Sequence, residues 1–430
     1  MLVVVSDLHL TDGTTSVWAA GRDQFNVSPG AGELFLAKVA DLVRHRPRPP
    51  REVVFVFAGD IFDLWRSRAW FALPASAWPW ATPPDDAALA DASLALLTSI
   101  AQRNAEFLTW LSGRHPGWAA LWPAAVPVRR VYLPGNHDRL VNRGPRCRAF
   151  VRAQLLAELG DEAPFPHWHA DATHQTLVGH GHEADPYNCE LTAAGQPDYD
   201  AAPIGDALTT MLLVRLGAAA ARRGLPPAVQ TGLLDLDNVR PPLAAVRYLR
   251  ALARQAGPGV PLWPLLDELV AAFTALPYYR AWESRHDRWT LGWDEADRLQ
   301  TALRALHLLG PTAPDGMLER LLGEGEDQAG PRLALRLLAR PPIPGDYAHV
   351  VLGHTHEAAH VPLGRAAVTG REQHYLNAGT FRTTLAPTFD GTAFVRLQRL
   401  AFVVVHAPGE FAADVAEPVY ELWSGVRQRH

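Results

Sequence analysis

The stretch that decides the fold of this chain is EVVFVFAGDIFDLW, residues 52–65. After Glu52, the stretch has a continuous apolar run over residues 53–58. Such a run is typical of a strand buried on both faces of an α/β sheet. The run turns at once into Gly59 and Asp60, and a second carboxylate follows at Asp63. Ligand sites in open α/β sheets form at the carboxyl ends of strands. The stretch therefore predicts a buried strand that delivers acidic side chains to a site.

Four further apolar runs have the same construction and end in the polar turns SDLH, PGNHD, GHGHEAD and GHTH. These runs cover residues 2–5, 128–133, 174–178 and 349–352. We expect all five to be strands of one α/β core. Together with GDIFD, the turns carry eleven candidate site residues: Asp7, His9, Asp60, Asp63, Asn136, His137, Asp138, His180, His182, His354 and His356.

The order of the patterns along the chain predicts an α/β core that is interrupted by helices. Residues 1–189 form the first part of this core, with a helical connection at 65–127. Strand patterns then fade, and Pro and Gly separate several helical patterns over 190–342 before strands resume in 343–430. Both ends of the insertion lie next to histidine turns, so we expect a helical cap that partly walls the site. The alternative is a dimerisation or packing module on the far side.

Composition excludes several classes of protein. The chain has 430 residues, 48% hydrophobic and 20% charged, which is ordinary for a globular protein, and its net charge of −5 makes long nucleic acid an unlikely partner. Cys147 and Cys189 form no C-x-x-C pattern, which argues against a disulfide framework or a thiolate zinc site. The apolar stretch 211–221 is broken by Arg215, and no signal-peptide pattern opens the sequence. We expect a cytoplasmic protein without stable membrane insertion, in an oligomeric state that the sequence leaves open.

The mixture of ligand types at the strand ends indicates a metal centre. Imidazole and carboxylate together suit borderline divalent ions such as Mn, Fe, Zn, Co or Ni, whereas all-oxygen sites favour Ca or Mg. The number of candidates exceeds one coordination sphere. Two metals roughly 3.5–4 Å apart can clamp the attacking and leaving oxygens of a phosphoryl displacement.

The motifs D-x-H, G-D-x-x-D, G-N-H-D, H-G-H and G-H-x-H follow one another in this order. The series resembles the calcineurin-like metallophosphoesterases, and most of all the branch that contains bacterial UDP-2,3-diacylglucosamine pyrophosphatases. The resemblance covers about residues 1–188 and 346–385. It implies a two-sheet α/β sandwich, here with a helical insertion, and the activity of a metal-dependent hydrolase.

Carried over residue by residue, the resemblance implies two divalent metal ions, with Mn as the first expectation. It implies His137 and Asp138 as catalytic residues: His137 stabilises or protonates the leaving oxygen, and Asp138, with Asp63, orients the rings. His182 replaces an aspartate of the related pyrophosphatases, so His180 is the favoured ligand, with His182 as the alternative. The implied metal ligands are Asp7, His9 and His356 for one metal, Asn136, His180 and His354 for the other, and Asp60 as the bridge.

These residues lead to one main functional hypothesis, in which a metal-bridging hydroxide hydrolyses a phosphoester. The substrate would be a small or nucleotide-like phosphoester, and the enzyme a phosphodiesterase, phosphatase or pyrophosphatase. Within the enzyme class, a nuclease or cyclic-nucleotide phosphodiesterase is the alternative. The rival from another class is an inactive binding or scaffold protein on the same fold. Glu183, Asp185 and Asn188 either shape the site or belong to a polar loop.

Overall fold

The structure of the chain is a computed structural model. It describes residues 1–15, 18–19, 22–23, 27–81, 86–157, 163–240, 244–257, 259–287, 296, 299–301, 303, 326–412 and 414–428. Residues 304–325 of the expected insertion therefore lie outside the described part. The fold is mixed α/β and contains two mixed sheets.

The first sheet is built around the strand that opened the sequence analysis. Its order is β13-β14-β1-β4-β5, and β15 pairs with β14. β1, β4 and β5 are parallel, whereas β14 runs antiparallel to β1. The strands are β1 (Leu2–Val5), β4 (Val53–Ala58), β5 (Val128–Leu133), β13 (Thr383–Pro387), β14 (Phe394–His406) and β15 (Val419–Gln428).

The second sheet has the order β11-β12-β10-β7-β6. Its central strands β7, β10 and β12 are parallel, and β6 and β11 are antiparallel edges. The strands are β6 (Trp168–Asp171), β7 (Thr176–Gly179), β10 (His349–Leu352), β11 (Ala359–Arg365) and β12 (Glu372–Asn377). The five predicted strands are confirmed, to within two residues at each end.

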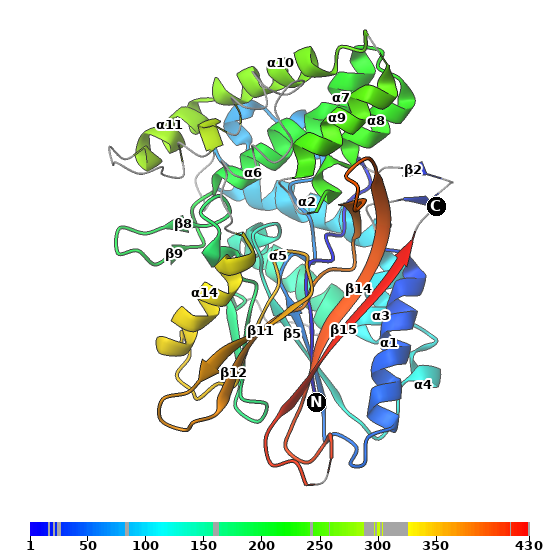
Figure 1. Cartoon of the computed structure of the whole chain (residues 1–430), viewed down its shortest axis with the longest axis vertical. Coiled ribbons are helices and arrows are strands. Elements are labelled where there is room, and N and C mark those ends of the chain that lie inside the picture. Colours follow the sequence, from blue (N-terminus) through cyan, green and yellow to red (C-terminus); the bar gives the residue numbers. More distant parts are fainter. Residues whose placement is uncertain are drawn as a thin grey trace.

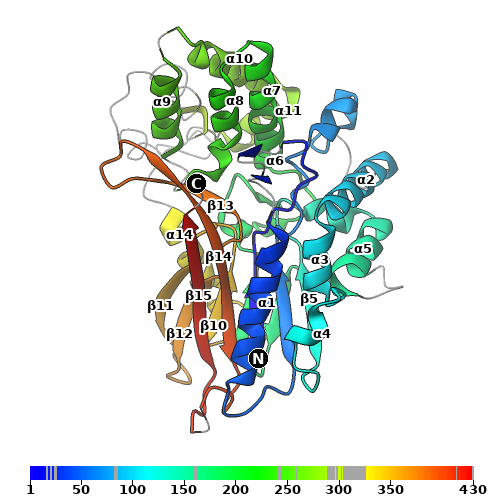
Figure 2. The same ribbon diagram turned by 90° about the vertical axis from the view of Figure 1, so that its right-hand side faces the viewer.

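The two sheets pack face to face, and helices cover their outer faces (Figures 1 and 2). Alternate residues of β1 and β4, such as Val4 and Val56, contact Val178 and Val351 of the second sheet in one buried cluster. The residues between them, such as Phe55, point to the opposite face and pack against helices. The helices over the first sheet are α1 (Pro29–Arg44), α2 (Ala87–Arg103), α3 (Ala105–Ser112), α4 (Trp118–Leu121) and α5 (Pro145–Val151).

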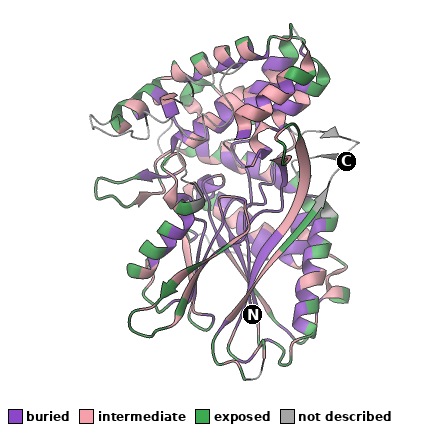
Figure 3. Cartoon of the chain, in the orientation of Figure 1, coloured by how far each residue is buried: buried purple, intermediate pink, exposed green. Residues whose placement is uncertain are grey.

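A group of helices lies above the carboxyl ends of the strands, and we call residues 204–286 the helical cap (Figure 1). Two apolar clusters hold its helices together, one around Leu233 and Leu266 and one around Trp282. Figure 3 shows that residues inside the cap are buried, as they are between the sheets. The cap contains α6 (Ile204–Leu208), a π-helical turn (Thr209–Val214), α7 (Arg215–Arg222), α8 (Pro227–Leu234), α9 (Ala245–Ala256), α10 (Leu262–Thr274) and α11 (Pro277–His286).

The last helix of the expected insertion, α14 (Glu326–Ala339), packs elsewhere. Its Leu333 and Leu337 contact Val350 and Tyr375 on the outer face of the second sheet, so α14 covers this sheet rather than joining the cap. Among the described residues, one stretch, Ile204–Arg222, is long and apolar enough to cross a membrane by length and composition. In the structure 61% of that stretch is buried by protein, which is also how a core helix behaves.

Candidate metal centre

The turns after β1, β4, β5, β7 and β10 meet at one edge of the sandwich, below the helical cap (Figure 1). Parallel strands end at the same edge of a sheet, and the two sheets present their carboxyl ends together. Residues that are up to 349 positions apart in the chain therefore share one small volume. Their metal-type side chains form three groups among the described residues. Two of these groups hold the expected ligands and are described first as two clusters, and the third, His9, Asp63 and His137, shares His9 with the first.

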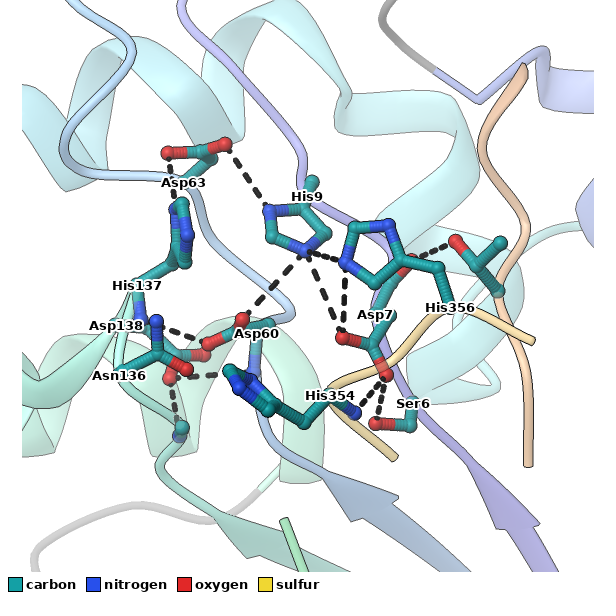
Figure 4. Close-up of polar contacts among 12 residues, drawn as sticks. Ser6, Asp7, His9, Asp60, Asp63, Asn136, His137, Asp138, His354 and His356 are labelled. Atoms are coloured by element: carbon teal, nitrogen blue, oxygen red, sulfur yellow. Dashed lines mark hydrogen bonds and ion pairs between the residues drawn. The ribbon is translucent and has the colours of Figure 1, made fainter. Parts of the chain in front are cut away.

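The first cluster consists of Asp7, His9 and His356, all buried. The Nε2 atoms of His9 and His356 lie 2.9 Å apart. Asp7 Oδ1 lies 3.6 Å from His9 Nε2 and 3.3 Å from His356 Nε2. Three lone-pair atoms therefore face one point, as Figure 4 shows. These are the residues that the resemblance assigned to one metal.

The second cluster consists of Asp60, His180 and His354, with Asn136 beside them. His180 Nε2 lies 3.2 Å from Asp60 Oδ2 and 3.1 Å from Asn136 Oδ1. The side-chain amide of Asn136 donates to Asn188 Oδ1 at 3.1 Å, which turns its carbonyl oxygen toward the cluster. These are the residues expected around the other metal.

Asp60 lies between the clusters. Its Oδ2 is 3.2 Å from His180 Nε2 in the second cluster and 3.5 Å from His9 Nε2 in the first. Its Oδ1 accepts a hydrogen bond of 2.8 Å from the backbone amide of His137. One oxygen is thus held by the loop after β5, and the other faces both clusters, as a bridging carboxylate requires.

The donor atoms fit divalent cations. Ligands bound at about 2.1 Å around one ion are separated by roughly 3.0–3.4 Å. The spacings within the first cluster, and those of His180 from Asp60 and Asn136 in the second, are close to this range. Asp7 Oδ1 is buried without a hydrogen-bond partner among the described residues, and a cation would satisfy it. Burial would lower the pKa of His180, but Asp60 and Asp7 outweigh it and raise that pKa to about 10. The negative charges of Asp60 and Asp7 also favour a metal cation at this position.

Backbone strain concentrates on the same residues. Seven described residues other than glycine have a positive φ angle, and five of them are candidate ligands. A positive φ is unfavourable for residues with a side chain, costs of order 1–3 kcal/mol, and persists where the surroundings enforce it. Such clustering is typical of functional sites. The five candidate ligands are Asp7, His9, Asp60, His354 and His356, with φ between 46° and 72°.

Two glycines of the motifs leave room for the ligands. A Cβ atom on Gly135 would lie 2.2 Å from Asp60 Oδ1, and one on Gly353 would lie 2.5 Å from Asp7 Oδ2. Real atoms do not approach this closely, so any side chain at either position would displace a carboxylate. The glycines before Asn136 and His354 are therefore required by packing across the site.

Asp63 connects two histidines. Its Oδ2 lies 3.0 Å from His9 Nδ1 and its Oδ1 lies 2.9 Å from His137 Nδ1. A carboxylate at Nδ1 fixes ring orientation and leaves Nε2 to act, which is the orienting role that we expected of Asp63. Burial lowers the pKa of His137, but the carboxylates of Asp63 and Asp60 outweigh it and raise the pKa to about 9.

Asp138 lies behind the site. It accepts hydrogen bonds from the backbone amides of Gly135 at 2.6 Å and Ile61 at 2.9 Å, and so ties the loop after β5 to the loop after β4. Burial and the nearby charge of Asp60 raise its pKa to about 6. Its described hydrogen bonds go to amides rather than to a histidine ring, so any catalytic part for Asp138 stays a prediction.

The loop after β7 adds residues whose role the sequence left open. His182 is buried near His180, with ring centres 5.3 Å apart, and belongs to neither cluster. Its Nδ1 has no hydrogen-bond partner among the described residues, and burial holds its pKa well below the usual range. Asp185 Oδ2 lies 3.1 Å from His354 Nε2 and accepts a hydrogen bond from Asn188. Asp185 and Asn188 thus contact expected ligands.

Residues from the helical cap also reach the site, and sequence reasoning missed them. Arg240 Nη2 lies 2.7 Å from Nδ1 of His356. Asp237 pairs with Arg66 and, at 3.1 Å, with Arg382. No motif surrounds Arg240 or Asp237 in the sequence. One feature of the sequence could have indicated them: charged residues cluster in the expected insertion, 190–342, which begins and ends beside the histidine turns.

No protein-family model matches the chain, and a search of curated proteins finds no match.

Proposed function

We propose that this chain is a dinuclear, metal-dependent phosphoester hydrolase with the sandwich fold of the calcineurin-like metallophosphoesterases. The observation that carries the proposal is the convergence of two clusters of metal-type side chains on either side of Asp60. Five loops supply them, in the order in which the motifs follow one another in the sequence. A binding or scaffold protein has no need for this set of strained ligands.

The chain's own residues divide the work. Asp7, His9 and His356 would hold one cation, Asn136, His180 and His354 the other, and Asp60 would contact both. The cations, when bound, would supply Lewis acidity that activates water and neutralises charge on a phosphoryl group. Manganese is the first expectation, and Fe, Zn, Co and Ni, which mixed imidazole and oxygen ligands also suit, are the alternatives. The neutral oxygen of Asn136 would leave its cation more electrophilic than a carboxylate would.

We infer that His137 transfers a proton. Asp63 contacts its Nδ1 at 2.9 Å, which orients the ring and leaves Nε2 to donate. The side chain is 15% exposed, so the ring can be reached from solvent. It would protonate or stabilise the leaving oxygen, a contribution of about 10²–10⁴-fold in rate.

The experiment that tests the proposal combines metal analysis with a substrate panel. Purified protein loaded with Mn²⁺ should contain two metal equivalents and hydrolyse at least one aryl phosphate monoester or diester. A chelator should abolish the activity, and added Mn²⁺ should restore it. Two bound metals without hydrolysis of any member of the panel would favour the binding protein. Less than one equivalent of any divalent metal would refute the proposed centre.

A further inference from the structure

We propose a separate metal site, for one borderline divalent cation such as Zn²⁺, between His360, His374 and Tyr420. It lies outside the metal centre and does not depend on the proposed function. His360 Nε2 lies 3.1 Å from His374 Nδ1, and the hydroxyl oxygen of Tyr420 lies 2.7 Å from the same His360 nitrogen. The three ring centres are 5.1–5.3 Å from one another. Three rings therefore surround one point and offer it two nitrogens and one oxygen.

The site lies at the opposite end of the sandwich from the metal centre. His374 pairs with His349, the first residue of β10. Tyr420 is level with Leu2, the first residue of β1, because β14 pairs with both strands at this position. The metal centre lies at the other ends of β1 and β10. His360 and His374 belong to β11 and β12 of the second sheet and Tyr420 to β15 of the first, so a shared cation would join the two sheets.

The donor atoms fit a cation of this type. Two nitrogens bound at about 2.1 Å to one ion lie roughly 3.0–3.4 Å apart, and the two imidazole nitrogens are 3.1 Å apart. Imidazole suits Zn²⁺, Cu²⁺ and Ni²⁺, whereas Ca²⁺ and Mg²⁺ prefer oxygen ligands. His360 is exposed, and His374 and Tyr420 are half-buried, so an ion can enter from solvent and keep a water molecule as its fourth ligand.

The protonation of the rings suits a role as ligands. Burial and repulsion by His360 lower the pKa of His374, so this ring is neutral near pH 7 and has a lone pair for a cation. Glu372 Oε2 lies 3.9 Å from His374 Nε2, so the ring proton can face this carboxylate while Nδ1 faces the other rings. Burial and Glu372 raise the pKa of Tyr420, so its hydroxyl keeps its proton without a metal. A bound cation would displace that proton into solvent.

The test measures the Zn²⁺ bound by the full-length protein after equilibrium dialysis near neutral pH. His360→Gln and His374→Gln should each bind one equivalent fewer than the wild type, because the two remaining donors hold the ion weakly. His360 is exposed, so its substitution leaves the core packing unchanged. The control is His45→Gln, which changes an exposed histidine at the end of α1 and should bind as much Zn²⁺ as the wild type.

Two further measurements test the oxygen ligand and the joining of the sheets. Tyr420→Phe should bind this Zn²⁺ at least about tenfold more weakly, since even a residue that only orients a ligand typically contributes 10–100-fold. It should also release one proton fewer on binding. Zn²⁺ should raise the thermal unfolding midpoint of the wild type more than that of His360→Gln, because an ion that binds only the folded state stabilises it.

Equal Zn²⁺ content in the wild type and both histidine variants would overturn the proposal, and the three rings would then be held only by hydrogen bonds. Wild-type affinity in Tyr420→Phe would overturn the site with three donors. The result is a difference between variants, so it does not depend on how many ions the metal centre holds. Failure of the proposed function would remove ions or activity from the wild type and the variants alike, and would leave the difference of one equivalent unchanged.

Discussion

The strand-end loops and the helical cap meet at the same site, but different interactions fix their positions. Each loop follows a buried strand within a few residues, so the register of the sheets sets where Asp7 or Asp60 lies. The cap is held by pairs between distant residues, such as Asp237 with Arg66 and Asp206 with Arg139. Single changes in the loops should therefore abolish chemistry in a folded protein. Single changes at the cap contacts should affect stability and specificity instead.

The largest effect is expected from Asp60→Asn, because Asp60 faces both clusters. Loss of one electrostatic group commonly costs about 10²–10³-fold in rate, and here two cations lose a ligand. We expect a rate more than about 10³-fold lower and reduced metal content, while the thermal unfolding midpoint of the chelated protein stays close to that of the chelated wild type. His354→Ala, which affects one cluster, is the comparison. A loss no larger than that of His354→Ala would mean that Asp60 does not bridge.

His137→Ala should separate chemistry from metal binding. We expect both metals to remain and turnover to fall by about 10²–10⁴-fold, because a proton donor is lost while the ligands stay. Metal analysis and kcat on the same sample measure the two effects. Loss of one metal equivalent would instead indicate that His137 is a metal ligand. His137 would then have to reach a metal while its neighbour His9 keeps its contact with Asp63.

The same contrast explains how much the sequence could predict. The five strands and the candidate ligands that follow them were readable because each strand and its polar turn occupy one short contiguous segment. The position of Arg240 was not readable, since it depends on how Val239 bridges to Leu385, 146 positions away in the chain. The packing of α14 on the second sheet was missed for the same reason, because helical periodicity does not specify a partner.

Asp237→Asn tests whether the cap is held by its buried pairs. The change removes the carboxylate that pairs with the buried guanidinium groups of Arg66 and Arg382. Removing one partner of a buried ion pair typically costs about 3–5 kcal/mol, and since Asp237 is 22% exposed we expect a loss at the lower end of this range. Urea unfolding measures the free energy. The control is Glu268→Gln on α10, whose pair with Arg223 is largely exposed, with an expected cost below about 1 kcal/mol. Equal losses in the two variants would show that the pairs of Asp237 do not anchor the cap.

The smallest expected effect lies in neither region but in the sheet beneath them, and concerns the pH dependence of stability. His349 is the first residue of β10 and is 3% exposed. It lies five residues before His354 in the chain and belongs to neither cluster. Burial lowers its pKa to about 4, and His374 and His174 add repulsion between rings when both are charged. Tyr420 and Thr176 also contact it.

The folded protein thus takes up this proton only near pH 4, whereas an unfolded histidine binds it near pH 6.5. Between these values the unfolded chain binds more protons, so stability is full above pH 6.5 and falls as the pH drops toward 4. The contribution of His349 is at most about 3 kcal/mol. In the His349→Gln variant, the loss of unfolding free energy between pH 6.5 and pH 4 should be smaller by about 1–3 kcal/mol. The measurement uses chelated protein, so that metal loss does not contribute. An unchanged slope in the variant would mean that other histidines with a lowered pKa, such as the half-buried His167, cause the acid sensitivity.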